Sequence, residues 1–248
     1  MDKNFEQQPT KHPLDIYKVF YPLAKLVIDR KYDSTIINPE NILDTPAIYA
    51  ANHIHAIDSF LITEAFTDTT TKPMRFVVKN GYTEGTGIDD KGKYGRTAKF
   101  IIDHTLHIPV SREGSTAEEY TAFEALAALT FKRGDSLGIH PEGTRSRDGL
   151  YKFRSGASRL AILNYVPIVP VGLVYNKLPH KRKTDVAISF GQPIYPKDLE
   201  HYPYDTLPGF KDKADHMTQV LEDRVAQQTG LIQTGVYAEL RKFRNEHQ

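Results

Sequence analysis

The sequence predicts an α/β fold, in which a mixed, largely parallel β-sheet is flanked by helices. Short segments with the composition of strands alternate with longer segments whose apolar residues recur at helical spacing. The expected strands are apolar throughout, as in "VPIVPVGLVY" at 166–175, which is typical of parallel strands that are covered on both faces. No linker is rich enough in proline, glycine or serine to mark a second domain, so residues 1–248 are expected to form a single domain.

Six segments have the composition of strands, and three between them have that of helices. The strands are expected at 47–52, 74–79, 106–112, 136–140, 166–175 and 186–191, and the helices at 58–66, about 115–133 and about 155–164. Ser115 and Glu118 have the spacing of a capping box that opens the second helix, and Gly134 is suited to end it. A glycine-rich loop between the second and third strands argues against regular structure there.

The two ends of the chain differ from this α/β core, which is expected at 36–200. Residues 1–35 are expected to form an N-terminal amphipathic helical segment, whose apolar part is too short and too charged to span a bilayer. That segment would either lie on a membrane surface or pack on the protein core. Residues 201–248 are expected to form packing helices, and the second of them starts near Val236. The first carries an apolar stripe made of Phe210, Ala214, Met217, Leu221 and Val225.

Composition and charge exclude several classes of function. The chain has 32 Lys and Arg against 31 Asp and Glu, so no global field favours nucleic acid and any anion site must be local. Cysteine is absent, which excludes disulfides, thiolate nucleophiles and cysteine metal ligands and fits a reducing compartment. The polar N-terminal sequence shows no secretory signal pattern, so a cytoplasmic protein is expected.

Two histidines and an aspartate lie close together in "NHIHAID", residues 52–58. Residues three apart share a face of a regular helix, so local geometry alone pairs Asp58 with His55 rather than with His53. Histidine titrates near neutral pH and a carboxylate can orient it, which suits general base catalysis. The same three side chains also have the chemistry of an open divalent metal site, which would make the protein a metal-dependent hydrolase.

A second stretch, "HPEGTRSRDG" at 140–149, has the composition of an anion site. Guanidinium groups bind phosphate through paired donors, and a turn offers backbone N–H groups beside them. Arg112, at the end of an expected strand, is placed to serve the same anion. The turn after the strand presents Thr144, Arg145, Ser146 and Arg147.

These stretches resemble sequence blocks of the glycerolipid acyltransferase superfamily. "NHIHAID" is similar to the family's N-H-x-x-x-x-D block, with His53 and Asp58 at its defining positions. "PEGTRSR" is similar to the F-P-E-G-T-R-S block, with His140 in place of the aromatic residue, and "VPIVPVG" resembles the last, apolar block. "IPVSR" places Arg112 where the family has a substrate-contacting arginine. The four blocks occur in the family's order over residues 50–172.

The resemblance implies an O-acyltransferase of the 1-acyl-sn-glycerol-3-phosphate type. Such an enzyme moves a fatty acyl group from acyl-CoA or acyl carrier protein to the free hydroxyl of a lysophospholipid, giving phosphatidic acid, without a cofactor or metal. His53 would act as the general base and Asp58 would orient it, while backbone N–H groups after Asn52 are candidate oxyanion donors. The acceptor phosphate would be held by Arg112, Glu142, Gly143, Thr144 and Arg145. Because that acceptor resides in a membrane, a peripheral location on the inner face is expected.

The pairing of His53 with Asp58 also predicts the local backbone. A spacing of five puts two residues about 140° apart on a regular helix, so this pair can meet only if the helix begins after His53. We therefore expect Asn52 and His53 at the strand end, a bend at 54–56 and Asp58 in the first helical turn, with His55 in a supporting role. A non-catalytic lipid-binding module with the same fold is a further interpretation.

The basic run "KLPHKRK" at 177–183 has two interpretations. A solvated charged loop is the simpler one, because runs of like charge are usually exposed to water. The alternative is a contact with anionic lipid or with an acidic acyl carrier protein.

Overall fold

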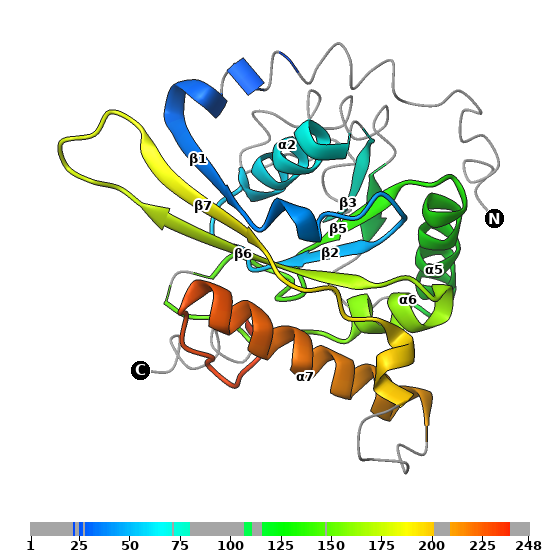
Figure 1. Cartoon of the computed structure of the whole chain (residues 1–248). Helices are drawn as coiled ribbons and strands as arrows, with labels where there is room; N and C mark the ends of the chain where they lie inside the picture. Colours follow the sequence, from blue (N-terminus) through cyan, green and yellow to red (C-terminus); the bar gives the residue numbers. More distant parts are fainter. Residues whose placement is uncertain are drawn as a thin grey trace.

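A computed structural model describes residues 22, 25–26, 28–70, 72–79, 107–110, 116–146, 148–200 and 209–238. Within them the chain forms a seven-stranded sheet with the order β1-β7-β6-β2-β5-β3-β4 and helices on both faces (Figure 1). The α/β class expected from the sequence is confirmed. The strands are β1 Tyr32–Ile37, β2 Ile48–Ala51, β3 Met74–Lys79, β4 Ile108–Val110, β5 Ser136–Ile139, β6 Ile168–Asn176 and β7 Thr184–Phe190.

The sheet is largely parallel, with one antiparallel join between β6 and β7. At its centre, Ala50 of β2 lies opposite Ile139 of β5, and Ala51 lies opposite Val171 of β6. The carboxyl ends of β2 and β5 therefore lie at one edge of the sheet, where β6 passes them on its way to β7. In open α/β sheets, ligands bind at the carboxyl edge. Both candidate motifs follow these strands, because "NHIHAID" leaves β2 and "HPEGTRS" leaves β5.

Helices cover the two faces of the sheet in separate layers (Figure 1). Strand β2 has the sequence "IYAA" and is buried at all four positions. Ile48 and Ala50 pack in a cluster with α5, α6 and α7, whereas Tyr49 and Ala51 pack in a cluster with α2. Covering on both faces explains why this central strand is apolar throughout. The helices are η1 Pro39–Asn41, α2 Asp58–Thr70, α5 Ala117–Lys132, α6 Gly156–Asn164, η2 Pro196–Glu200 and α7 Phe210–Thr229.

Two local expectations from the sequence are wrong. Tyr32–Ile37 forms the edge strand β1, whereas a helical segment was expected up to residue 35; its β-branched "STII" favours the strand. The capping box of α5 is formed by Thr116 and Glu119, one residue after the expected pair Ser115 and Glu118. The Thr116 hydroxyl accepts from the Glu119 N–H at 3.2 Å, and the Glu119 carboxylate accepts from the Thr116 N–H at 3.1 Å.

The described part of the N-terminal segment packs on the core. Residues 28–31 are helical, and Ile28 is buried in the cluster beneath α2. The Lys25 ammonium forms ion pairs with Glu64 and Asp68 of α2. Packing on the core was one of the two expectations for this segment, and its earlier residues lie outside the described part. None of the described helices combines the length and the apolar character needed to span a membrane.

The C-terminal helix α7 buries most of its expected stripe. Ala214, Met217, Leu221 and Val225 are all buried against the sheet and α6. Phe210, at the first position of the helix, is instead exposed, and the guanidinium of Arg159 lies 5.1 Å from the centre of its ring. The second helix was expected from about Val236, and most of that stretch lies outside the described residues.

Candidate active site

The first candidate motif forms the connection between β2 and α2. Strand β2 ends at Ala51, residues 52–54 have no regular structure, residues 55–57 bend and turn, and α2 begins at Asp58. The Asp58 N–H donates to the carbonyl of His55 at 3.1 Å, which closes the turn. The spacing of five therefore corresponds to a strand-to-helix elbow, as expected.

Asn52 continues the sheet with its side chain. Its Nδ2 donates to the carbonyl of Leu173 at 3.0 Å, and the Leu173 N–H donates to its Oδ1 at 2.8 Å. These two hydrogen bonds come directly after the backbone pairing of Ala51 with Val171. The backbone after β2 can therefore leave the plane of the sheet, because the side chain of Asn52 still binds β6. An amide side chain offers both a donor and an acceptor, which explains why asparagine suits this buried position. The sequence motif by itself does not indicate this role of Asn52.

The elbow brings His53 and Asp58 together. His53 Nδ1 lies 2.9 Å from Oδ2 of the fully buried Asp58, and this oxygen also accepts from the N–H groups of Ile54 at 2.6 Å and His55 at 2.9 Å. Burial alone would raise the pKa of Asp58, but hydrogen bonds from His53, Tyr175 and the backbone lower it below its usual value. Because Asp58 is ionised and accepts from Nδ1, that nitrogen carries the proton and Nε2 of His53 is the basic nitrogen.

Tyr175 completes the surroundings of Asp58, and no sequence motif marks it as a site residue. Its hydroxyl donates to Oδ1 of Asp58 from strand β6, 117 positions along the chain. Burial and the charge of Asp58 both raise the pKa of Tyr175, so the hydroxyl stays protonated and remains a donor. The ring of His55 stands edge-on to the ring of Tyr175, with 4.6 Å between centroids. His55 therefore packs against Tyr175, and its supporting role stays a prediction.

Residues of the second candidate motif form hydrogen bonds with both the N–H and the carbonyl of His53. The His53 N–H donates to Oε1 of Glu142 at 2.8 Å, and the Ser146 N–H donates to the carbonyl of His53 at 2.7 Å. The other oxygen of Glu142 accepts from the N–H of Tyr151 at 2.9 Å. Glu142 was expected to hold the acceptor phosphate, but its buried carboxylate is occupied by backbone donors and positions His53 instead. Burial, which outweighs these hydrogen bonds, raises the pKa of Glu142 to about 7.

His140 lies parallel to His53, with 4.0 Å between ring centroids and 11° between ring planes. Its Nδ1 lies 3.1 Å from the carbonyl of Ala51 and 3.2 Å from that of Asn52, and its Nε2 lies 3.1 Å from the hydroxyl of Ser59. Because carbonyls accept, Nδ1 carries the proton and Nε2 accepts from the hydroxyl. Burial lowers the pKa of His140 to about 3, so the ring is neutral and places no positive charge against His53.

The turn after His140 presents an exposed arginine beside this site. Gly143 adopts a left-handed conformation with φ of 71°, and its N–H donates to the carbonyl of His140 at 3.0 Å. Arg145 is exposed and forms no ion pair with the residues that the structure describes. It directly precedes Ser146, whose N–H donates to the carbonyl of His53, so the backbone of Arg145 lies close to that of the candidate base. Arg112 and Arg147, also expected to bind an anion here, lie outside the described residues.

A metal site would require His53, His55 and Asp58 to converge on one point. Instead, His53 and two backbone N–H groups occupy Oδ2 of Asp58, while the ring of His55 packs on Tyr175. In the described part of the chain, no group of three or more His, Asp and Glu side chains is arranged to hold a metal ion. The three side chains therefore do not converge on one point.

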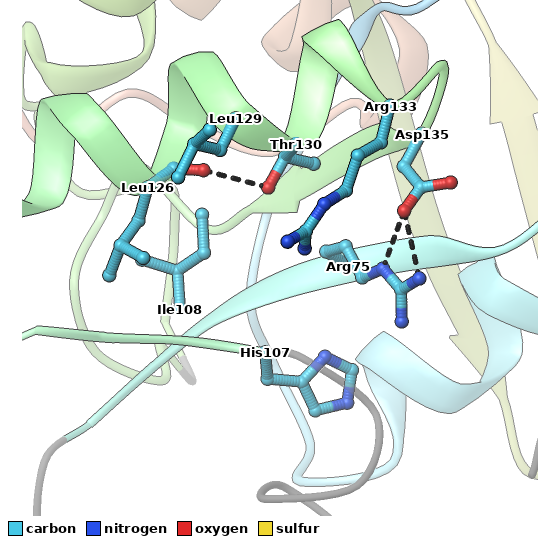
Figure 2. A pocket seen from close by; sticks show the side chains of 8 residues that line it. All are labelled: Arg75, His107, Ile108, Leu126, Leu129, Thr130, Arg133 and Asp135. Carbon is cyan, nitrogen blue, oxygen red and sulfur yellow. Dashed lines mark hydrogen bonds and ion pairs between the residues drawn. The ribbon is translucent and has the colours of Figure 1, made fainter. Parts of the chain in front are cut away.

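A separate polar cluster lies at the amino ends of β3, β4 and β5, in a small pocket beside α5 (Figure 2). The candidate site lies at the other ends of these strands. Arg75 of β3 donates through Nε and Nη2 to Oδ2 of Asp135 at 3.0 and 2.8 Å, and both side chains are buried. His107 Nδ1 accepts from the N–H of Phe76 at 3.0 Å, and burial lowers the pKa of His107 to about 3. Asp135 precedes β5 whereas His140 follows it, so this cluster supports the strands away from the candidate site.

The fold and the site define an α/β protein with an oriented histidine at the carboxyl edge of its sheet and an exposed arginine in the turn that bonds the backbone of this histidine. A family model described as Acyltransferase matches residues 33–174, which is more than half of the chain. The chain belongs to this acyltransferase family.

Known proteins that are similar to this chain in sequence share one enzyme name. The chain is 29% identical over 177 residues to a probable 1-acyl-sn-glycerol-3-phosphate acyltransferase of Mycoplasma pneumoniae, covering 69% of this chain and 61% of that protein. It is 30% identical over 137 residues to the 1-acyl-sn-glycerol-3-phosphate acyltransferase of Escherichia coli, covering 54% and 51%. The match thus spans about half to three-fifths of the length of these relatives.

The crystal structure of the 1-acyl-sn-glycerophosphate acyltransferase from Thermotoga maritima superposes with a TM-score of 0.53. The two sequences are 20% identical, and the alignment covers 87% of this chain and 80% of the other. The shared fold is therefore independent evidence for the α/β architecture.

Proposed function

We propose that this protein transfers a fatty acyl group from a thioester donor, acyl-CoA or acyl carrier protein, to the free hydroxyl of 1-acyl-sn-glycerol-3-phosphate, giving phosphatidic acid. The observation that carries the proposal is the His53–Asp58 pair, because it leaves Nε2 of His53 as a base oriented at the edge of the sheet. The relatives named for this acceptor support the substrate class.

In the proposed reaction the acceptor hydroxyl attacks the thioester carbonyl while Nε2 of His53 takes its proton. The tetrahedral intermediate then collapses, the new ester forms, the carbon–sulfur bond breaks, and the imidazolium returns the proton to the leaving thiolate. Asp58 stays ionised and stabilises the imidazolium of His53 through Nδ1. The stacked ring of His140 is neutral, so it does not repel this imidazolium. The step needs no acyl-enzyme, cofactor or metal, since the acceptor itself is the nucleophile.

The acceptor phosphate is proposed to bind Arg145 in the turn at Gly143 and Thr144, with Arg112 as the further cation. Arg145 is exposed and lies one residue before Ser146, which bonds the backbone of His53, so its guanidinium is proposed to hold the phosphate while the hydroxyl approaches Nε2. The buried carboxylate of Glu142 contributes indirectly, because it fixes the backbone on which the base is mounted.

Two of the backbone N–H groups that were expected as candidate oxyanion donors are already hydrogen-bonded. The N–H groups of Ile54 and His55 lie at the start of the elbow, but both donate to Asp58. They therefore orient the carboxylate and are not free for the tetrahedral intermediate.

Product analysis with the purified full chain tests this function. Acyl-CoA and acyl carrier protein donors would each be offered with lysophosphatidic acid, lysophosphatidylcholine or no acceptor, and the lipids identified by mass spectrometry. Phosphatidic acid formed from lysophosphatidic acid supports the proposal, and a chelator should leave the rate unchanged. Release of free fatty acid without acylation of any acceptor would indicate a hydrolase, and lipid binding without turnover would indicate a binding module.

A further inference from the structure

Exposed cations gather at the edge of the sheet that carries the candidate site. Four of them lie in the turn between β6 and β7, and two precede β1. We call this set the basic edge; it consists of Arg30, Lys31, Lys177, Lys181, Arg182 and Lys183, all exposed. The carboxylates of Asp29, Asp33 and Asp185 offset half of this charge. Because the whole chain carries a net charge of only +1, the remaining excess of positive charge is a local property of this basic edge.

Strand pairing brings the two segments of the basic edge together. Strand β1 runs parallel to β7, and Tyr32 pairs with Thr184. Lys31 and Lys183 each come one residue before this pair, so they lie next to each other at the start of the two strands. The β6–β7 hairpin projects beyond the body of the sheet, and β1 runs beside it (Figure 1). Residues distant in the sequence thus present their cations on the same side of the molecule.

The basic edge is also directly connected to the candidate site. Tyr175, which donates to Asp58, lies in β6 two residues before Lys177, the first residue after this strand. At roughly 3.3 Å per residue, the middle of the hairpin turn lies within about 17 Å of Tyr175. The ring of Tyr32 contacts that of Tyr175 with 6.3 Å between centroids, so both parts of the basic edge adjoin the side chains around Asp58.

We propose that the basic edge binds the surface of an anionic phospholipid bilayer and so holds the candidate site against the membrane. The proposal rests on the proposed function, in which a membrane lipid delivers its hydroxyl to His53. Leu26 is 52% exposed and lies one helical turn before Arg30, and Leu178 lies within the basic turn. Cations with interspersed apolar side chains suit a bilayer surface, where headgroups attract the charges and apolar side chains enter the interface.

A matched pair of double variants of the full chain tests this surface. Lys181→Gln/Lys183→Gln removes two lysines of the basic edge, one of which pairs with Asp185 at 2.7 Å. Lys211→Gln/Lys213→Gln removes two lysines with the same spacing at the start of α7, one of which pairs with Asp215 at 2.9 Å. Both variants lose two charges and one exposed lysine–aspartate pair, and circular dichroism would confirm that both fold.

Binding would be measured by co-sedimentation with vesicles of phosphatidylcholine, with or without phosphatidylglycerol, at low and high salt. We expect salt-sensitive binding to the phosphatidylglycerol vesicles, about tenfold or more weaker in the hairpin variant and unchanged in the α7 variant. Equal binding by the hairpin variant and the wild type, or equal losses in both variants, would overturn the proposal.

The activity of the same variants separates this proposal from the proposed function. With acyl-CoA and a monomeric short-chain acceptor in solution, the hairpin variant should match the wild type, whereas it should be slower on acceptor embedded in vesicles. The hairpin variant could instead bind vesicles as well as the wild type and transfer acyl groups more slowly only from acyl carrier protein. That result would overturn the proposal and assign the basic edge to the carrier protein. If the wild type transfers no acyl group at all, the proposed function fails, while the vesicle measurement still tests the surface.

Discussion

The hydroxyl of Tyr175 donates to Oδ1 of Asp58, while His53 contacts the other oxygen of the same carboxylate at 2.9 Å. With the N–H groups of Ile54 and His55, four donors surround one buried carboxylate. A carboxylate has about four acceptor positions, so Asp58 is fully hydrogen-bonded and can be ionised although it is buried. The orientation of His53 therefore depends on a tyrosine from a different strand.

Removing the Tyr175 hydroxyl tests this dependence. Tyr175→Phe should lower kcat by roughly tenfold, since a hydrogen bond to a charged group contributes about 1.5–3 kcal/mol, and should leave KM nearly unchanged. The pKa of Asp58 should rise, because one of the hydrogen bonds that lower it is lost. Steady-state kinetics would measure the effect. Tyr32→Phe removes a hydroxyl from the neighbouring ring and should behave as wild type; the same loss in both variants would contradict a specific role for Tyr175.

Replacing Glu142 tests whether it holds the candidate base in position. Glu142→Gln leaves a single acceptor for the N–H groups of His53 and Tyr151, so the His53 backbone should shift and kcat should fall by about tenfold. The matched control is Glu222→Gln, because Glu222 is also buried and accepts from the N–H of Phe153 at 2.8 Å, without contact to His53. Equal activity of the two variants would show that Glu142 acts only on stability.

Glu142 should also affect how stability depends on pH. Its pKa is raised from 4.5 to about 7 by burial, so the folded state binds a proton more tightly than the unfolded state. The stability associated with this proton is present below pH 4.5 and is lost as the pH rises through about 7, by at most about 3 kcal/mol. Glu142→Gln should flatten the decline in the free energy of unfolding over this range in denaturant titrations. An unchanged slope would mean that Glu142 ionises normally.

His140 predicts a pH dependence of the opposite sign. Its pKa is lowered from 6.5 to about 3 by burial, so the unfolded state takes up a proton that the folded state does not. Stability should therefore fall as the pH drops from 6.5 towards 3. His140→Phe retains an aromatic ring beside His53 and should lose less stability over this acid range than the wild type. The exposed His180 provides the control, and an equal change in His180→Phe would contradict the assignment.

Much of the site could be predicted from local sequence. Local geometry alone pairs Asp58 with His55; once the family resemblance pairs Asp58 with His53, their spacing of five excludes a continuous helix between them, and the observed helix does begin at Asp58. The apolar strands likewise predicted a sheet covered on both faces. In both cases the information lies within about a dozen residues, where backbone geometry restricts the possible structures.

Other features depend on contacts that local sequence does not contain. Tyr175 meets Asp58 only because β6 pairs with β2, and no local pattern marks that tyrosine. Glu142 lies in a turn that resembles an anion site, yet burial against the backbone of His53 gives it a supporting role. The strand β1 is different, because its β-branched "STII" favours a strand locally, yet it directly follows a segment of helical character.

The most direct test of the account compares the two histidines of the elbow in acyl transfer to lysophosphatidic acid. His53→Ala removes the proposed base and should lower kcat by about a thousandfold, within the range of general base catalysis. His55→Ala removes a ring that packs on Tyr175 and should cost less than about tenfold. Circular dichroism would establish that both variants fold. Equal losses in the two variants, or a His53→Ala variant with wild-type activity, would contradict the account.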